Sequence, residues 1–411
     1  MNTLRRIRFT ALLGLAATLL ILPPARATTI LRPFTGGTTG GSPGGSLTLS
    51  GSKLYGMASA GGFNGFGTAF SINTDGTGFV RLHSFAGGAS DGREPHGSLT
   101  LSGSMLYGTT YLGGSSNFGT VFSMNIDGTG FGLLHSFTGI DDGRYAGAGL
   151  TLSGSTLYVM SISGNGTLFR MNTDGTGFSQ IHGFNGGAGD GLRPVGSLTL
   201  SGSTLYGMTG NGGAANQGTV FSMNTDGTGI AVLHSFLNSG KDGLLPSGSL
   251  TLSGSKFYGM TNAGGTYPHN VGTIFSMNTD GTGFTLLHSF SGGTGDGQYP
   301  YGSLTLIGST LYGMTNSGGS TNNGTIFSLN TDGTGYALLE SFGVTSTDGA
   351  QPGGDLTPSG DGSTLYGMTS LGGVNGAGVI FSKSIVPEPT SAALLLSGTA
   401  LLALRRRRGL A

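Results

Sequence analysis

Histidine, the residue type best suited to metal or proton chemistry, recurs in this chain at a regular spacing of roughly 50 residues. Imidazole nitrogen is a preferred zinc ligand, so a set of equivalent histidines raises the hypothesis of a metal ring. Zinc, however, holds its ligands within about 2 Å of one ion, and residues placed once per repeat lie far apart. We therefore expect structural histidines and no metal site at these positions: His83, His135, His182, His234 and His288.

Aspartate recurs at two positions of the same repeat. Carboxylates bind calcium, but aspartate also caps turns, so we expect capping and no cofactor, with calcium left open. The two sets hold 12 of the 18 acidic residues, which leaves no evident pair of carboxylates for glycoside hydrolysis. The first set lies in Asp-Gly turns and comprises Asp75, Asp127, Asp174, Asp226, Asp280 and Asp332. The second set precedes each new copy and comprises Asp91, Asp142, Asp190, Asp242, Asp296 and Asp348.

Tyrosine marks the repeat most clearly, because it occurs once in each of seven copies. A row of tyrosines could stack on sugar rings. Each tyrosine stands in the middle of an apolar run beside leucine and methionine, which favours a place in the core instead. The seven are Tyr55, Tyr107, Tyr158, Tyr206, Tyr258, Tyr312 and Tyr366.

Each copy reads as four short strands, and the fifth copy shows the pattern. The predicted strands are residues 249–252, 256–261, 272–278 and 284–290. An Asp-Gly pair at Asp280 forms the hairpin between the last two strands, because such turns need positive φ. A four-stranded unit of about 50 residues, repeated seven times, indicates small sheets arranged radially. A β-solenoid is the alternative, although its repeat is usually shorter.

The two ends of the repeat region complement each other. Ile30–Phe34 resembles the last strand of a copy but precedes the first copy, and the seventh copy stops at Phe381 without that strand. We expect an all-β, seven-bladed β-propeller over residues 28–385, whose N-terminal strand completes the last four-stranded blade and removes the open edge. This alignment places Pro33 and Glu340 at the histidine position of the two copies that lack histidine.

The sequence of the repeat unit also resembles the tandem GloVer repeats of exported bacterial proteins. The matching pieces in the fourth copy are Leu205-Tyr206-Gly207, Gly212-Gly213, Gly218–Phe221, Leu233–Phe236 and Asp242-Gly243. The resemblance covers residues 30–383, and the third copy departs from it at Val159. The resemblance implies export, often with a C-terminal sorting tail. It gives no biochemical activity that could be carried over to this chain.

Residues 1–27 have the three parts of a secretory signal peptide. Arg5, Arg6 and Arg8 form the positive region, an apolar stretch follows, and Ala25-Arg26-Ala27 supplies the cleavage pattern. A cytoplasmic helix is the alternative. We expect cleavage after Ala27 and export.

Residues 386–411 resemble a PEP-CTERM sorting signal. Pro387, Glu388 and Pro389 precede an apolar run, and four arginines follow at 405–408. The run of 391–404 is short for a membrane span, although a simple membrane anchor is the alternative. The resemblance implies processing near Pro387-Glu388-Pro389 by an exosortase, contact with the membrane only through this tail, and the outer surface or matrix of a Gram-negative bacterium.

Composition excludes several partners. The chain has 18 basic and 18 acidic residues, and the repeat region between the two ends keeps 10 basic against 17 acidic, for a net charge of −7. An acidic body without a basic patch argues against nucleic acid. The chain has no cysteine, which excludes disulfides and thiolate chemistry.

Loops on the two faces of such a ring differ. Those after the first and third strands are nearly identical between copies, whereas those after the second and fourth strands vary in polar and aromatic residues. Varied loops on a rigid scaffold are typical of a recognition surface, with unconstrained loop drift as the alternative. We expect any ligand to be a polysaccharide bound by these residues: Arg93, His96, Tyr111, Arg144, Tyr145, Arg193, Tyr267, His269, Tyr299 and Tyr301.

The sequence thus predicts an exported repeat protein of the cell surface or extracellular matrix, with a structural or polysaccharide-binding role through many weak contacts. A polysaccharide lyase or glycosidase is the alternative. It would need acids or histidines that converge, for which Glu94, His96 and His269 are the candidates. We expect no enzyme activity and no catalytic residue.

Overall fold

The computed structural model describes residues 28–139, 142–237, 242–266 and 269–385. The predicted signal peptide with Ala27, the predicted sorting tail with Pro387, Glu388 and Pro389, and the candidate Tyr267 lie outside the described residues. Residues 27–385 form one compact unit. In the described part of the chain, no helix is long and apolar enough to cross a membrane.

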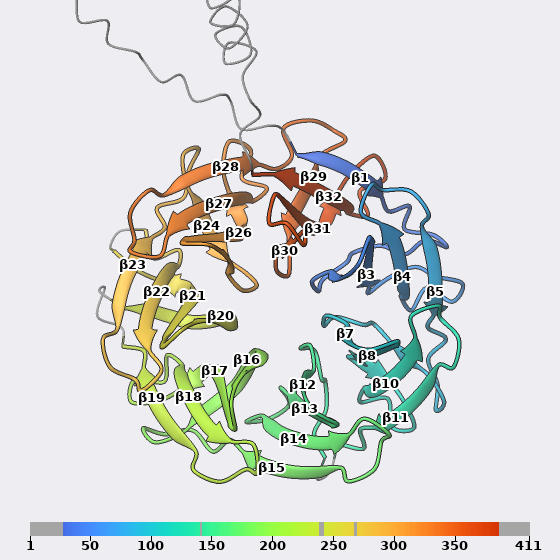
Figure 1. Ribbon diagram of the computed structural model, residues 1–411, viewed down its shortest axis with the longest axis horizontal. Helices are drawn as coiled ribbons and strands as arrows, with labels where there is room; N and C mark the ends of the chain where they lie inside the picture. Colours follow the sequence, from blue (N-terminus) through green and yellow to red (C-terminus); the bar gives the residue numbers. More distant parts are fainter. Residues whose placement is uncertain (1–27, 140–141, 238–241, 267–268, 386–411) are drawn as a thin grey trace, which may run out of the picture. The chain divides into compact units, whose positions relative to one another are not determined.

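Seven small antiparallel sheets stand in a ring and form a seven-bladed β-propeller, which confirms the predicted fold (Figure 1). The innermost strands are β2 (Thr48–Ser50), β7 (Thr100–Ser102), β12 (Thr151–Ser153), β16 (Gly191–Ser201), β20 (Gly243–Ser253), β24 (Gly297–Pro300) with β25 (Thr305–Ile307), and β29 (Gly349–Pro352) with β30 (Thr357–Pro358). The second strands are β3 (Lys53–Ala58), β8 (Met105–Thr110), β13 (Thr156–Ser161), β17 (Thr204–Gly212), β21 (Lys256–Gly264), β26 (Thr310–Gly318) and β31 (Thr364–Gly372).

The outer half of each blade holds two more strands. The third strands are β4 (Thr68–Asn73), β10 (Thr120–Asn125), β14 (Thr167–Asn172), β18 (Thr219–Asn224), β22 (Thr273–Asn278), β27 (Thr325–Asn330) and β32 (Val379–Ser384). The outer strands are β5 (Val80–Ser84), β11 (Gly132–Ser136), β15 (Ser179–Gly183), β19 (Ala231–Ser235), β23 (Thr285–Ser289), β28 (Ala337–Ser341) and β1 (Thr29–Pro33). A short extra pair, β6 (Gly92–Arg93) and β9 (Leu112–Gly113), flanks the second blade.

The innermost strand of the fifth blade begins earlier than the sequence pattern indicates. It starts at Gly243, because Gly243 pairs with Gly264 at the end of β21. The register then shifts between Ser247 and Thr251, where the chain bends before it continues the ladder. In the fourth and fifth blades the segment after Asp190 and Asp242 is therefore not only a connection but the start of the inner strand, β16 or β20.

The N-terminal strand closes the ring, as predicted. β1 pairs antiparallel with β32, with Ile30 opposite Phe381. Arg32 lies opposite Ile380 just as His288 lies opposite Ile274 in the fifth blade, so Arg32 and not Pro33 stands at the histidine position. The expectation for Pro33 was wrong by one residue, because Pro33 aligns with Ser289, the residue after His288, and the bulge between Ile30 and Arg32 recurs in the other outer strands.

The core lies between blades rather than within them. Tyr258 and Met260 of the fifth blade pack in one cluster with Leu311 and Phe327 of the sixth. Five of the seven repeated tyrosines are buried as predicted, for example Tyr258 at 5% exposure, whereas Tyr206 and Tyr312 are partly buried and pack against the core clusters. Each blade is thus stable only because its neighbours cover both of its faces.

The Asp-Gly turns are capped as predicted. The carboxylate of Asp75 accepts hydrogen bonds from the backbone N–H of Thr77 at 2.9 Å and from its hydroxyl at 2.7 Å. These bonds lower the pKa of Asp75, which is fully exposed. The same two contacts recur at Asp127, Asp174, Asp226, Asp280 and Asp332.

Candidate ligand-binding site at the channel mouth

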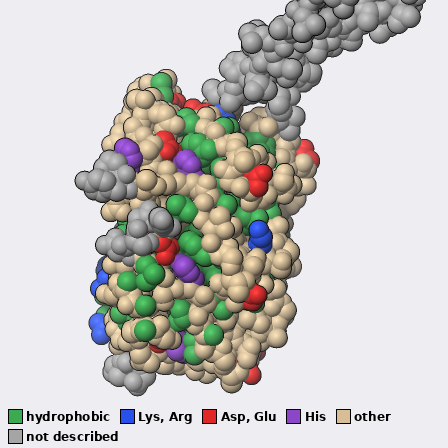
Figure 2. All heavy atoms as spheres, turned by 90° about the vertical axis from the view of Figure 1, so that its left-hand side faces the viewer, with side chains coloured by type: hydrophobic (Ala, Val, Ile, Leu, Met, Phe, Trp, Pro, Cys, Tyr) green, Lys and Arg blue, Asp and Glu red, His purple; other side chains and the backbone are tan. Residues whose placement is uncertain are grey.

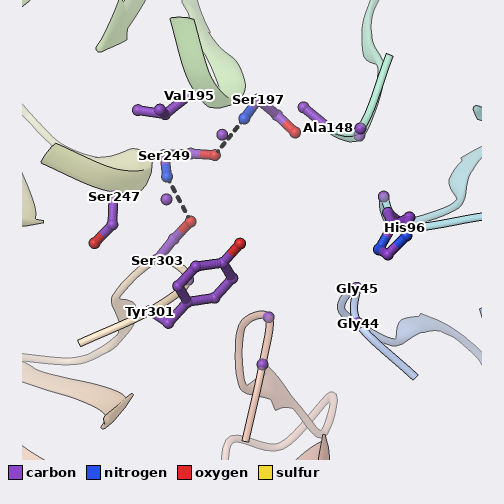
Figure 3. Close-up of a pocket in the computed structure, with 18 of the residues that line it drawn as sticks. Gly44, Gly45, His96, Ala148, Val195, Ser197, Ser247, Ser249, Tyr301 and Ser303 are labelled. Carbon is purple, nitrogen blue, oxygen red and sulfur yellow. Dashed lines mark hydrogen bonds between the residues drawn. The ribbon is translucent and has the colours of Figure 1, made fainter. Parts of the chain in front are cut away.

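Three consecutive residues from each blade surround a cavity of about 860 Å³ at the centre of the ring (Figure 3). The segment that enters each inner strand supplies them, on the face that carries the variable loops. The first positions are Gly44, His96, Gly147, Val195, Ser247, Tyr301 and Gly353. The second are Gly45, Gly97, Ala148, Gly196, Gly248, Gly302 and Gly354, and the third are Ser46, Ser98, Gly149, Ser197, Ser249, Ser303 and Asp355.

The second position is small because neighbouring inner strands approach there most closely. A Cβ atom on Gly248 would lie 1.9 Å from the carbonyl oxygen of Gly302, and one on Gly196 would lie 2.1 Å from that of Gly248. Both glycines also have positive φ, near +70° and +64°. Backbone therefore forms this level of the cavity wall, and peptide groups are available to a ligand.

The third position joins one blade to the next. The backbone N–H of Ser249 donates to the hydroxyl oxygen of Ser303 at 2.8 Å, and that of Ser197 donates to Ser249 at 2.8 Å (Figure 3). Asp355 replaces serine in the last blade and accepts from the N–H of Ser303. A serine hydroxyl that accepts such a bond keeps its own proton to donate, so these serines present hydroxyl donors around the cavity.

A second circle of inter-blade bonds lies behind the first. The hydroxyl of a threonine in each inner segment donates to a leucine carbonyl in the next blade. The seven pairs are Thr48–Leu99, Thr100–Leu150, Thr151–Leu198, Thr199–Leu250, Thr251–Leu304, Thr305–Leu356 and Thr357–Leu47. These bonds fix the blades at constant spacing and so hold the cavity wall rigid.

Seven residues with left-handed backbone stand two positions before the first wall residue of each blade, and Arg193, Leu245 and Gln351 among them also line the cavity. None is glycine, although φ between about 50° and 61° disfavours other residues. Each is held by its N–H, which donates to a carbonyl in the preceding blade; Tyr299 to Val271 at 2.7 Å is one example. Such strain clusters at ligand-binding positions. The seven are Ser42, Glu94, Tyr145, Arg193, Leu245, Tyr299 and Gln351.

Four of the predicted ligand-binding residues line the cavity: His96, Tyr111, Arg193 and Tyr301. Figure 3 shows His96 and Tyr301 on opposite sides, with the Tyr301 hydroxyl directed into the space between them. His96 is exposed to the cavity, yet surrounding atoms displace enough water to lower its pKa, and the charge of Glu94 opposes this shift only in part. His96 is therefore neutral at pH 7, with one nitrogen to donate and one to accept.

Aromatic rings extend the wall on the His96 side. Tyr145 stacks on Tyr111 with ring centroids 4.6 Å apart and an angle of 18°. The ring of His96 meets Tyr111 edge-on at 5.5 Å. Tyr145 thus supports the cavity wall from behind and is not among the residues that line it.

The other predicted residues do not line the cavity. Arg93 lies over the ring of Phe66 at 5.6 Å and Arg144 over Phe118 at 4.6 Å, so both guanidinium groups pack on aromatic rings. Tyr299 is 42% exposed but stands outside the lining, as does His269. The sequence pattern misses the small residues of the wall, because glycine and serine there look like ordinary turn residues.

The repeated histidines have structural contacts. Nε2 of His83 lies 3.1 Å from the carboxylate of Asp91, and the ring of His83 stacks on Phe131 of the next blade at 3.7 Å. Asp91 also accepts the backbone N–H groups of Ala86 and Gly92, which is the predicted capping. The same pairing recurs in four more blades, at His135–Asp142, His182–Asp190, His234–Asp242 and His288–Asp296.

Figure 2 shows histidine and acidic side chains scattered over the side of the ring that faces the viewer. Within the described ranges, no three histidine, cysteine or acidic side chains are grouped so that they could hold a metal ion. The histidine–aspartate pairs therefore join the end of one blade to the start of the next.

The fold and the repeated inner segments define a seven-bladed propeller built from one repeat unit. The chain belongs to the Gloeobacter/Verrucomicrobia repeat family, whose model matches residues 17–165 and 160–381. No curated protein matches the sequence. Membership agrees with the GloVer resemblance of the repeat.

Several solved structures share the fold. An oligogalacturonate lyase in complex with manganese is 11% identical, with a TM-score of 0.56, and the match covers 88% of this chain and 93% of that one. The oligogalacturonate lyase from Vibrio parahaemolyticus is 13% identical, with a TM-score of 0.55 and coverage of 87% and 93%. A putative 6-phosphogluconolactonase from Bacteroides fragilis is 17% identical, with a TM-score of 0.51 and coverage of 78% and 87%. Identities this low show the fold alone.

Proposed function

We propose that this protein is an exported propeller of the cell surface or extracellular matrix that binds polysaccharide at the channel mouth. The observation that carries the proposal is the placement of Tyr301 opposite His96 across one cavity, with Tyr111 in ring contact with His96. Tyrosine rings offer flat apolar faces to a sugar, and hydroxyl and peptide groups between them offer hydrogen bonds.

The charge of the cavity indicates which polysaccharides fit. Arg193 and Asp355 are the charged side chains among the described lining residues, and His96 is neutral. The lining is therefore balanced in charge, which suits a neutral polysaccharide better than a highly acidic one. The alternative is a purely structural role for the propeller, without a ligand.

Export rests on the two ends of the sequence. The signal peptide of residues 1–27 would be removed after Ala27, and an exosortase-type enzyme would process the tail near Pro387-Glu388-Pro389. Fractionation of the host, with intact mass measurement of the mature chain, tests this part. A chain that keeps both ends and stays in the cytoplasm would refute export.

Binding is tested with a glycan array. The chain used is residues 28–385, which close into a ring with their own strands and are therefore self-contained. We expect a small set of related, mainly neutral glycans to be retained in the same way with and without calcium. An array that stays blank in both conditions would refute polysaccharide binding and leave the structural role.

An enzyme that acts on polysaccharide remains the alternative function. Glu94 and His96 belong to one loop, and the charge of Glu94 acts on His96. No hydrogen bond joins these two residues in the described structure. We expect no reducing ends and no unsaturated products when the chain is incubated with the glycans it binds. Product release that the variant His96→Gln abolishes would overturn the non-enzymatic proposal.

A further inference from the structure

One blade departs from the histidine–aspartate pattern. In the sixth blade Glu340 occupies the histidine position, and the aspartate that follows it is Asp348. Both residues line a second cavity, of about 230 Å³, beside the closing strand β1. This place in the ring therefore holds two carboxylates where five other blades hold one carboxylate and one imidazole.

A buried lysine balances one of these charges. Lys383 stands in β32 at a position that holds methionine in other copies, for example Met277. Its side chain is 1% exposed, and its Nζ lies 3.0 Å from Glu340 Oε2 and 2.9 Å from the carbonyl of Leu339. A buried lysine needs such a partner, because an unpaired ammonium is costly to bury. One lysine cannot neutralise both Glu340 and Asp348.

The first described residue of the chain reaches the same carboxylate. Glu340 Oε2 accepts hydrogen bonds from the backbone nitrogen of Thr28 at 3.0 Å and from its hydroxyl at 2.7 Å. Thr28 also lines the cavity with Glu340 and Asp348. This nitrogen directly follows Ala27, after which the sequence predicts cleavage.

Cleavage would change the charge of that nitrogen. Hydrolysis of the peptide bond between Ala27 and Thr28 consumes one water and leaves a carboxylate on Ala27 and an α-amino group on Thr28. The α-amino group is mostly protonated near pH 7. A neutral N–H donor would thus become an ammonium group 3.0 Å from a carboxylate.

We propose that Glu340 and Asp348 form a binding site for the mature amino terminus, which the ring receives when the leader is removed. Two carboxylates, Lys383 and the new ammonium group together carry no net charge. The proposal rests on the export part of the proposed function and is independent of glycan binding.

The location of the site explains its composition. For four of the five paired histidines the hairpin between third and outer strands of the next blade supplies an aromatic ring, as Tyr336 does for His288 at 4.0 Å. In the seventh blade those two strands are β32 and β1, which come from opposite ends of the chain. That hairpin does not exist, so its ring is missing. Thr28, at the start of the described chain, contacts Glu340 there instead.

The test uses residues 28–385 released from a fusion so that Thr28 is the first residue. Acylation of the α-amino group at pH 7, followed by mass spectrometry, measures how firmly it is held. We expect the rate to be about tenfold lower than in a free peptide of the same first residues, because only the unprotonated amine reacts. We expect the variants Glu340→Gln and Asp348→Asn each to restore part of the lost rate. Asp348→Asn leaves the Lys383 contact in place and remains informative if Glu340→Gln does not fold.

A second comparison needs no substitution in the ring. In the same chain with Ala27 retained, the ammonium group is on Ala27 and no longer beside Glu340. We expect its melting temperature to be about 1–3 °C lower than that of the chain that begins with Thr28. Acylation at the free-peptide rate in the chain that begins with Thr28, or identical melting of the two chains, would overturn the proposal. A leader found intact on the protein from its host would instead refute export.

Discussion

The hydroxyl of Thr357 donates a hydrogen bond of 2.6 Å to the carbonyl of Leu47, across 310 residues of sequence. This bond completes the circle of seven threonine–leucine bonds around the channel. Its position shows that the last and first blades meet in the same way as any other neighbours. The mouth of the channel is therefore one continuous wall, although its two ends are distant in the chain.

Loss of one bond in this circle should weaken the ring measurably. Thr199→Val keeps the shape of the side chain but leaves the carbonyl of Leu250 without its donor. We expect the free energy of unfolding to fall by about 1–2 kcal/mol in denaturant titrations. Thr199→Ser, which keeps the hydroxyl, is the control and should lose less. Equal losses in the two variants would mean that the methyl group, not the bond, is what matters.

Closure by β1 can be trapped covalently, because the natural chain has no cysteine. Thr29 and Ser382 face each other in the ladder between β1 and β32. The double variant Thr29→Cys/Ser382→Cys should form an intramolecular disulfide under mild oxidation and gain about 2–4 kcal/mol of stability. Thr29→Cys/Ser136→Cys, with the second cysteine on the second blade, is the control that should not close. Failure of the first pair to cross-link in the monomer would contradict the closure.

The seam between the sixth and seventh blades should respond as a coupled pair. Glu340→His alone restores the residue of the repeat but leaves Lys383 buried without its carboxylate, and we expect a loss of about 3 kcal/mol. Adding Lys383→Met, which is also the residue of the repeat, should recover most of that loss. Thermal and chemical unfolding of the three chains measure it. A double variant as unstable as Glu340→His would show that the two residues act independently.

Acid should weaken the sixth blade through Asp296. Burial alone would raise the pKa of Asp296, but hydrogen bonds from His288 and Tyr336 outweigh it, so the pKa falls to about 2. A carboxylate with a lowered pKa stabilises the fold above its unfolded pKa of about 3.9, and the contribution disappears as pH falls through about 2. Asp296→Asn should therefore cost about 2 kcal/mol at pH 7 and progressively less from pH 4 downward.

Tyr336→Phe is the matched variant for this pH effect. Phenylalanine occupies the equivalent position as Phe284 in the fifth blade, so the packing is compatible with the repeat. Removal of the hydroxyl takes one donor from Asp296 and should raise its pKa, which moves the acid-induced loss of stability to higher pH. An unchanged acid profile in this variant would show that Tyr336 does not hold the carboxylate in its charged form.

The architecture was predictable because the same pattern of strands and turns recurs along the sequence. Seven copies of one tyrosine and six copies of one Asp-Gly turn specify the blades, and the complementary ends at Ile30 and Phe381 specify the closure. The bulge in each outer strand, for example between Leu286 and His288, was not predictable, since no residue type marks it. Nor was the contact between His83 and Asp91, because it depends on how the loop between them folds.

The candidate site was predictable only in part. Sequence variation identified the face of the ring, and it identified Tyr301 and His96 within that face. It did not separate them from Arg93 and Arg144, whose guanidinium groups lie over Phe66 and Phe118. The direction of a loop side chain cannot be read from sequence: Arg193 and Tyr299 share the same left-handed backbone, yet Arg193 lines the cavity and Tyr299 does not.

Two tyrosines of one loop provide the most direct test of binding at the channel mouth. Tyr301 lines the cavity, whereas Tyr299 is exposed two residues earlier and does not line it. Titration calorimetry with the glycan found on the array should show about tenfold weaker binding for Tyr301→Asn, because a stacking ring is lost. Tyr299→Asn should bind like the natural chain, since asparagine tolerates the left-handed backbone. Unchanged affinity in Tyr301→Asn, or an equal loss in Tyr299→Asn, would place the ligand elsewhere and contradict the account.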